Sequence, residues 1–212
     1  MSTAPPYDFR SKYLKTHWIT RRLLEGFFGD IETVVRGLPL SSVLEIGCGE
    51  GFSTQRIRKF LPPQVQFEAS DVEDRLVEAA RRANPDVVFR RESIYEMERP
   101  ARSVDLVFVL EVLEHLQEPA RAMEQVCRLS RRWVLASVPR EPLWRLMNLA
   151  RGKYLARGGN TPGHVQHWTS RGFSRFMGRY GCVVAVRRPI PWTIVLVDLT
   201  ADPRRAGSVR GG

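Results

Sequence analysis

The sequence lacks the features that would place the chain in a membrane or outside the cell. Among its 212 residues there is no apolar run of roughly eighteen, the length that a membrane-spanning helix needs. The N-terminal segment has no apolar stretch of the kind found in a secretion signal. Only three cysteines occur, Cys48, Cys127 and Cys182, and their spacing forms no metal-binding motif. We therefore expect a cytoplasmic protein with reduced thiols and no bound metal.

Acidic residues are in the minority. The chain has 33 Lys and Arg against 23 Asp and Glu, a formal net charge of +10. Such an excess can serve nucleic acid, an anionic membrane or an acidic substrate. Most of the basic residues, however, are arginines spread along predicted helices, as at 81–82 and 131–132. Spread charge is typical of a solvated surface, so we expect no nucleic-acid partner.

The most informative segment is VLEIGCGEG at residues 43–51. An apolar run ends there, and glycines follow at alternate positions, Gly47, Gly49 and Gly51, before a helix-like stretch at 52–61. Without Cβ atoms a backbone can come close to a ligand. The order strand, glycine turn, helix predicts a site for a nucleotide-like cofactor.

The glycine spacing narrows the choice of cofactor. In a dinucleotide fingerprint the third glycine stands three residues after the second, whereas here the spacing is two. Glu45 would also be unfavourable beside a pyrophosphate, and a positively charged cofactor suits it better. The Lys-Ser/Thr pair of a phosphate-binding loop is missing. A dinucleotide-dependent oxidoreductase is thus the weaker alternative.

A carboxylate follows the second predicted strand. Asp71 stands about twenty residues after the glycine loop, where an acidic residue can accept both hydroxyls of a ribose. Alternatively, Asp71 only caps the helix predicted at 73–83. Its position relative to the glycine loop favours the ribose role.

Alternating strands and helices predict the fold. Strands are expected near 43–46, 65–70, 87–90, 104–110, 132–138, 182–188 and 192–199. With helices between them, the pattern indicates an α/β protein with a doubly wound, mostly parallel seven-stranded sheet and helices on both faces. Right-handed crossovers would bring the loops named above to one edge of that sheet.

Together these segments resemble a class I S-adenosylmethionine-dependent methyltransferase of the small bacterial type, similar to methyltransferase domain 11. The resemblance rests on VLEIGCGEG at 43–51, Asp71, SIYEM at 93–97, SVDLVFVLEVLEHL at 103–116 and WVLASVP at 133–139. It covers roughly residues 40–199. It implies a Rossmann-like fold whose last strand is antiparallel, with S-adenosyl-L-methionine as the cofactor.

The resemblance also implies the cofactor contacts. Gly47, Cys48, Gly49 and Gly51 would pack against the methionine part, and Glu45 and Glu111 would lie near its ammonium and sulfonium charges. Asp71 would hold the ribose, with Val72 beside it, and Ser93 and Ile94 would line the adenine. Many relatives carry Asp where Ser93 stands, so the adenine amino group is contacted differently here.

Three parts of the chain are expected. Residues 1–39 form an N-terminal helical cap, in which amphipathic helices at 16–36 cover the cofactor. Residues 40–199 form the methyltransferase domain, with a substrate lid inserted at 140–168. The tail at 200–212 has no apolar periodicity and is expected to be disordered.

Histidines are the candidates for a catalytic base, which transfer to a hydroxyl requires. His115 stands four residues after Glu111, so a helical turn would place both on one face; a structural role in the motif is the favoured alternative. His164 and His167 lie in the loop at 160–168, which can overhang the methyl group. The alternative is a loop that packs Trp168 into the core. The neighbouring glycine favours His164 over His167.

The segment at 141–157 bears on the acceptor. It combines apolar and basic residues, so an amphipathic helix there would rest on a membrane or close over an apolar substrate; packing on the core is the alternative. Trp144, Met147 and Trp192 predict apolar walls. We expect a small, apolar or lipid-like acceptor that is methylated on oxygen.

Two other functions remain open: a non-catalytic protein that binds S-adenosylmethionine or activates a partner, and an RNA methyltransferase. For an RNA methyltransferase, two motifs that would support this function are missing from the sequence. The Asn/Asp-Pro-Pro-Tyr/Phe motif of amine methylation is absent after the fourth strand, where the chain reads LEVL at 110–113. No cysteine stands at that edge for methylation of a pyrimidine carbon. The oligomeric state is not predicted.

Overall fold

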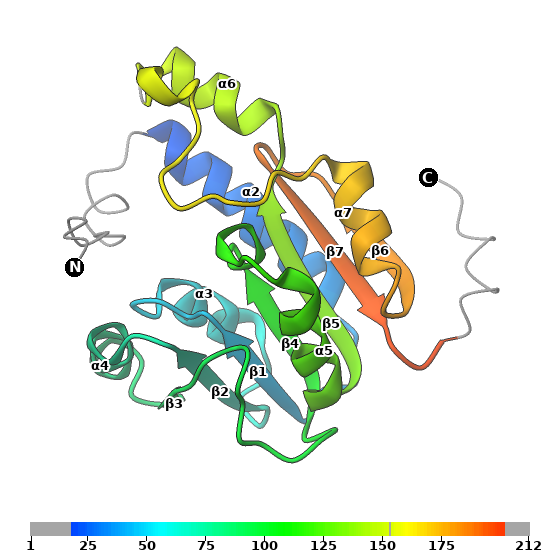
Figure 1. Cartoon of the computed structure of the whole chain (residues 1–212). Helices are drawn as coiled ribbons and strands as arrows, with labels where there is room; N and C mark the ends of the chain where they lie inside the picture. The colour runs from blue at the N-terminus through cyan, green and yellow to red at the C-terminus, as the bar shows by residue number, and fades with distance from the viewer. Residues whose placement is uncertain (1–17, 153, 202–212) are drawn as a thin grey trace.

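The computed structural model describes residues 18–152 and 154–201, and its centre is a seven-stranded sheet in the order β3-β2-β1-β4-β5-β7-β6 (Figure 1). The strands are β1 Ser42–Ile46, β2 Gln66–Asp71, β3 Val88–Arg91, β4 Val104–Leu110, β5 Ser130–Pro139, β6 Cys182–Arg187 and β7 Trp192–Asp198. Strands β1 to β5 pair in parallel, and β7 is antiparallel to both β5 and β6. The predicted α/β sheet with its antiparallel last strand is confirmed, and each strand lies within two residues of its predicted bounds.

Helices cover both faces of this sheet (Figure 1). They are α2 Trp18–Val35, α3 Phe52–Phe60, α4 Asp74–Ala83, α5 Pro119–Leu129, α6 Leu143–Ala150 and α7 Ser170–Met177, with 3-10 turns η1 Leu113–His115 and η2 Leu155–Arg157. Helices α2, α3 and α4 contribute to one hydrophobic cluster, and α5 and α7 contribute to the other.

Strand β4 is apolar at every position from Leu106 to Leu110, and its packing shows why. Leu106 and Phe108 belong to the cluster on one face, Val107 and Val109 to the cluster on the other, and all four have 0% exposure. Successive side chains of a strand point to opposite faces, so the part of a central strand that is covered on both sides is apolar throughout. This run places the β4–η1 junction at the carboxyl edge of the sheet.

The predicted lid, residues 140–168, begins where β5 ends. It contains α6 and η2 and returns to α7 as a loop beyond the carboxyl edge of the sheet (Figure 1). The two limbs of this segment are joined because Trp144 Nε1 donates to Thr161 Oγ1 at 2.9 Å and Asn148 Nδ2 donates to the Gly159 carbonyl at 2.9 Å. Its apolar side chains do not all pack on the core: Leu146 and Leu155 are exposed.

The predicted terminal parts are only partly within the described residues. Of the N-terminal cap at 1–39, residues 1–17 lie outside them, and helix α2 packs its Phe27, Phe28 and Ile31 into the core. Of the tail at 200–212, only residues 200 and 201 are described. Among the described helices, none combines the length and the apolar character that crossing a bilayer requires.

Candidate functional site

The glycine loop between β1 and α3 has a left-handed backbone at each glycine. The φ angles of Gly47, Gly49 and Gly51 are 78°, 53° and 79°. The amides of Gly47 and Cys48 both donate to the carbonyl of Ser70, at 2.8 and 3.0 Å. The loop is thereby fixed against the end of β2, as the parallel pairing of β1 and β2 predicts.

The three glycines face different surroundings. A Cβ at Gly47 would lie 2.3 Å from Val112 Cγ2, and one at Gly51 would lie 2.5 Å from Asn84 Nδ2. A Cβ at Gly49 would meet no atom within 4 Å. Two glycines are therefore required by internal packing, whereas Gly49 presents an open backbone surface that a ligand can approach closely.

Asp71 lies beside this loop as the last residue of β2. Its Oδ2 accepts the Gly49 amide at 2.9 Å, and its Oδ1 accepts the Glu73 amide at 3.1 Å. The side chain thus both links the strand to the glycine loop and satisfies an amide at the start of α4. Because Glu73 is the N-cap residue itself, this contact orders the approach to α4 and does not cap an amide of its first turn.

Glu45 is a buried carboxyl beneath the loop, with 1% exposure. Its Oε2 accepts the Thr54 hydroxyl at 2.5 Å, and its Oε1 accepts no hydrogen bond. Burial raises the pKa of Glu45 to about 7. A buried carboxyl with an unsatisfied oxygen attracts a positively charged or hydrogen-bond-donating group.

Glu111 stands at the end of β4 in a strained conformation, with φ 58°. Its Oε1 accepts the Ser137 hydroxyl at 2.9 Å, and its Oε2 accepts Trp192 Nε1 at 2.7 Å. Burial raises the pKa of this carboxyl to about 8. Strained residues of this kind are concentrated at ligand sites, where the surrounding contacts hold them.

The remaining predicted cofactor residues differ in exposure. Val72 is 57% exposed beyond β2, whereas Ile94 is packed in the core cluster. Ser93 is half-buried, and its Oγ accepts the Tyr95 amide at 3.3 Å. Cys48 is buried, and this burial raises the pKa of its thiol, so it stays protonated and unreactive, as expected for a small loop residue.

Two of the three candidate histidines are brought together. The rings of His115 and His164 are 4.8 Å apart at an interplanar angle of 82°. His115 Nδ1 donates a hydrogen bond to the Gly163 carbonyl at 3.0 Å. His167 is placed differently: it is exposed, and its Nδ1 lies 3.7 Å from Glu141 Oε1.

A row of aromatic side chains connects the histidine pair with Glu111. The Trp144 ring stacks on His164 at 6.1 Å and lies 6.2 Å from the ring of Trp192, the residue that donates to Glu111. Phe27 of α2 extends the row, 4.8 Å from Trp192. Sequence reasoning identified both tryptophans but missed Phe27, because an amphipathic pattern does not tell which strand its helix meets.

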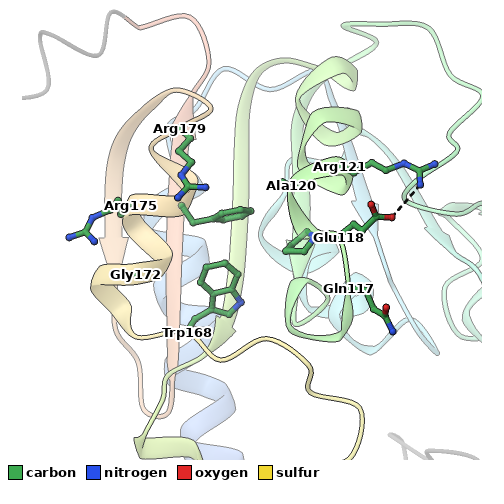
Figure 2. Close-up of a pocket in the computed structure, with 10 residues that line it drawn as sticks. Gln117, Glu118, Ala120, Arg121, Trp168, Gly172, Arg175 and Arg179 are labelled. Atoms are coloured by element: carbon green, nitrogen blue, oxygen red, sulfur yellow. Dashed lines mark hydrogen bonds and ion pairs between the residues drawn. The ribbon is translucent and has the colours of Figure 1, made fainter.

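A separate groove of about 710 Å³ lies between the start of α5 and helix α7 (Figure 2). It is lined by Gln117, Glu118, Pro119, Ala120, Arg121, Trp168, Gly172, Arg175, Phe176 and Arg179. Arg121 is paired with Glu118 at 3.4 Å, and Arg175 points away from the groove (Figure 2). None of the glycine-loop residues lines it, so it is distinct from the site described above.

Comparison with known proteins identifies the family of the chain. Residues 12–185 match a family model described as a methyltransferase domain. A search of functionally curated proteins gave no significant match.

Solved structures share the fold at low sequence identity. A SAM-dependent methyltransferase from Aquifex aeolicus is 17% identical with a TM-score of 0.63, covering 80% of this chain and 89% of that one. The methyltransferase domain of bacterial CtHen1-C is 21% identical with a TM-score of 0.65, covering 84% and 100%. Magnesium protoporphyrin IX methyltransferase from Synechocystis, solved with bound SAH, is 18% identical with a TM-score of 0.62, covering 86% and 88%.

The family match spans most of the chain, and the glycine loop, Asp71 and the buried acidic residues lie where the strand order brings them together. The chain therefore belongs to the methyltransferase domain family, and it is an S-adenosylmethionine-dependent methyltransferase.

Proposed function

We propose that this methyltransferase acts on the hydroxyl oxygen of a small, apolar or lipid-like acceptor. When bound, S-adenosylmethionine supplies a methyl carbon that is activated by the sulfonium. The protein's contribution is then to position donor and acceptor, exclude water and remove the hydroxyl proton.

The donor side uses the residues of the glycine loop and the strand ends. The open face of Gly49 takes the methionine part, and Asp71 accepts the ribose hydroxyls. Glu45 and Glu111 are buried carboxyls with raised pKa values, and a cationic ligand beside them favours their ionised forms. Val72, Ser93 and Ile94 surround the adenine.

The acceptor proposal is carried by one observation, the aromatic row that runs from Phe27 through Trp192 and Trp144 to His164. Trp192, within this row, donates to Glu111 on the donor side, and the row ends at the imidazole of His164. Apolar aromatic walls with few polar groups are typical of pockets for apolar small molecules.

Proton removal falls to the pair His115 and His164. The Nδ1–H of His115 is held by the Gly163 carbonyl, so its Nε2 carries the lone pair. Burial lowers the pKa of His115, which keeps the ring neutral and able to accept a proton near pH 7. The imidazole would take the proton from the acceptor hydroxyl as the oxygen receives the methyl group that the bound cofactor would supply.

The lid supports an apolar acceptor as well. Leu146, Leu149 and Leu155 are exposed on the segment at 141–157, which also carries basic residues. An apolar surface next to cationic side chains favours contact with an anionic membrane surface, from which a lipid-like acceptor would enter.

A labelling experiment tests the proposal. The protein is incubated with methyl-labelled S-adenosylmethionine and a matched panel of alkyl phenols, alkyl alcohols, alkyl amines and RNA. We expect label on the hydroxyl compounds, rising with alkyl chain length. Label on amines or RNA alone would refute O-methylation, and intact donor binding without label on any compound would favour the non-catalytic alternative.

Two variants give this experiment its control. His164→Asn should slow the transfer while leaving the affinity for the donor unchanged, because His164 contacts the acceptor side only. His167→Asn changes a histidine of the same loop that pairs with Glu141 instead, so its transfer rate should match that of the unmodified protein.

A further inference from the structure

Glu114, His115 and His164 form a compact cluster at the carboxyl edge of the sheet. Each offers one ligand atom, and the three atoms lie within 4.8 Å of one another. Glu114 and His115 belong to η1, directly after β4, whereas His164 lies in the loop before α7. The fold therefore unites one carboxylate and two imidazoles from distant parts of the sequence.

Backbone contacts hold the two parts of this cluster together. The amides of Val165 and Gln166 both donate to the carbonyl of Glu114, at 2.9 and 3.0 Å. His115 Nδ1 donates to the carbonyl of Gly163, at 3.0 Å. The histidine loop is thus fixed on η1 from both sides of His164, and the three side chains are positioned before any ligand arrives.

The carboxyl of Glu114 has an unmet electrostatic requirement. Glu114 is 1% exposed, and its Oε2 accepts no hydrogen bond. Within residues 18–152 and 154–201, no Lys or Arg is recorded in an ion pair with Glu114. Because a buried carboxyl without a partner is costly, a cation is the group that would satisfy it.

His115 has the hydrogen bond that a metal-binding histidine usually makes. Its Nδ1 proton is donated to a backbone carbonyl, which fixes the tautomer and leaves Nε2 to coordinate. Because His115 is exposed, an ion can reach the cluster from solvent.

We propose that Glu114, His115 and His164 bind one divalent transition-metal ion of the zinc type. Two imidazole nitrogens and one carboxylate oxygen are a ligand set that holds such an ion and leaves an open coordination position. Ligand atoms about 2.1 Å from an ion are roughly 3.4 Å apart in a tetrahedral site. The three ligand atoms, which lie within 4.8 Å of one another, would draw together to that spacing around a bound ion.

This site was not predicted from the sequence, which led us to expect no metal. Its consequence for catalysis rests on the proposed function: an acceptor hydroxyl in the open position would lose its proton more readily, because a bound cation lowers the pKa of a coordinated oxygen. The ion would then replace the direct base role of the two histidines. Binding of the ion itself does not depend on the acceptor.

Metal binding is measured on the full chain after treatment with a chelator. We expect the protein to take up one equivalent of Zn²⁺ by elemental analysis, and one of Co²⁺ with a visible absorption band. Glu114→Gln, His115→Asn and His164→Asn should each weaken Co²⁺ binding at least tenfold. His167→Asn is the matched control and should bind like the unmodified protein.

Folding is checked in each variant by circular dichroism and by titration with S-adenosylmethionine. His115 is exposed, so its variant tests the cluster without disturbing the core. Uptake well below one equivalent by the unmodified protein, or equal binding by all four variants, would overturn the proposal. If the protein takes up no ion but still labels the hydroxyl compounds, the metal site is refuted and the proposed O-methylation stands. If it takes up an ion but labels no hydroxyl compound, the proposed O-methylation is refuted and the metal site stands.

Discussion

The carboxylate of Asp71 accepts the amide of Gly49 at 2.9 Å, which ties the end of β2 to the glycine loop that follows β1. Its second oxygen accepts the Glu73 amide at the start of α4. One side chain therefore links β2 to the glycine loop and to the start of α4, and the proposed function also assigns it the ribose hydroxyls. This double role makes Asp71 the most direct test of the donor site.

Replacing Asp71 with Ala should weaken binding of S-adenosylmethionine about 10- to 150-fold, because loss of a charge-assisted hydrogen bond costs about 1.5–3 kcal/mol. Isothermal titration calorimetry measures the affinity. Asp74→Ala removes an exposed carboxylate of α4 and should leave the affinity unchanged. Equal affinities for both variants would restrict Asp71 to a role in the loop.

Gly49→Ala should abolish donor binding while the protein stays folded. The added methyl group meets no protein atom within 4 Å, so it occupies the space that a ligand needs, and the only folding cost is the positive φ of 53°. Left-handed backbone costs a non-glycine residue about 1–2 kcal/mol. Thermal unfolding together with titration separates the two effects; normal binding by this variant would place the donor elsewhere.

Gly47→Ala should instead unfold or strongly destabilise the protein. Its Cβ would lie 2.3 Å from Val112 Cγ2, a contact that packing cannot accommodate. Adding Val112→Ala removes the clashing methyl groups and should recover part of the stability measured by urea unfolding. If the second substitution recovers none, the strain resides in the backbone alone.

Glu45 should make the protein less stable as the pH rises. Below pH 4.5 the carboxyl is protonated in both states, but between pH 4.5 and about 7 only the unfolded state releases the proton, because burial raises the folded pKa. The free energy of unfolding should fall by about 3 kcal/mol across this window and level off above it. Glu45→Gln should remove that contribution in urea unfolding between pH 5 and 8, and parallel curves for the two proteins would contradict it.

Trp192→Phe keeps an aromatic ring but removes the donor to Glu111 Oε2. We expect a loss of about 1–3 kcal/mol in the free energy of unfolding and a further rise in the pKa of Glu111, since this hydrogen bond lowers it. Trp168→Phe is the matched control, because Trp168 Nε1 has no hydrogen-bond acceptor in the described structure. A greater loss for Trp168→Phe would contradict the assignment.

The glycine loop and the sheet could be predicted because their signals are local. Alternating glycines mark a backbone that must turn sharply, and the apolar run at 106–110 marks a strand that is buried on both faces. The helical turn that would place Glu111 and His115 on one face does not begin at Glu111. Glu111 has a positive φ, and the turn begins at Leu113, because the glutamate side chain is held by Ser137 and Trp192 from neighbouring strands.

The pairing of the histidines could not be predicted from the sequence. Only the neighbouring glycine favoured His164 over His167 as the catalytic base. Nothing in the spacing of the residues indicated that His164 would contact His115. That pairing depends on the amides of Val165 and Gln166, which bind the Glu114 carbonyl and turn His164 toward η1. His167 follows in the same loop but meets Glu141 instead.

The sequence by itself determined the sheet and the glycine loop, since strand periodicity and glycine conformation are properties of short segments. Only the tertiary structure decided which side chains meet at the carboxyl edge of that sheet. The contacts of Trp192 with Glu111, and of His164 with His115, join residues far apart in the chain, and they arise because β7 inserts beside β5 and the lid loop folds back on η1. Burial then gives these acidic and imidazole groups the pKa values and partners that their residue types alone do not specify.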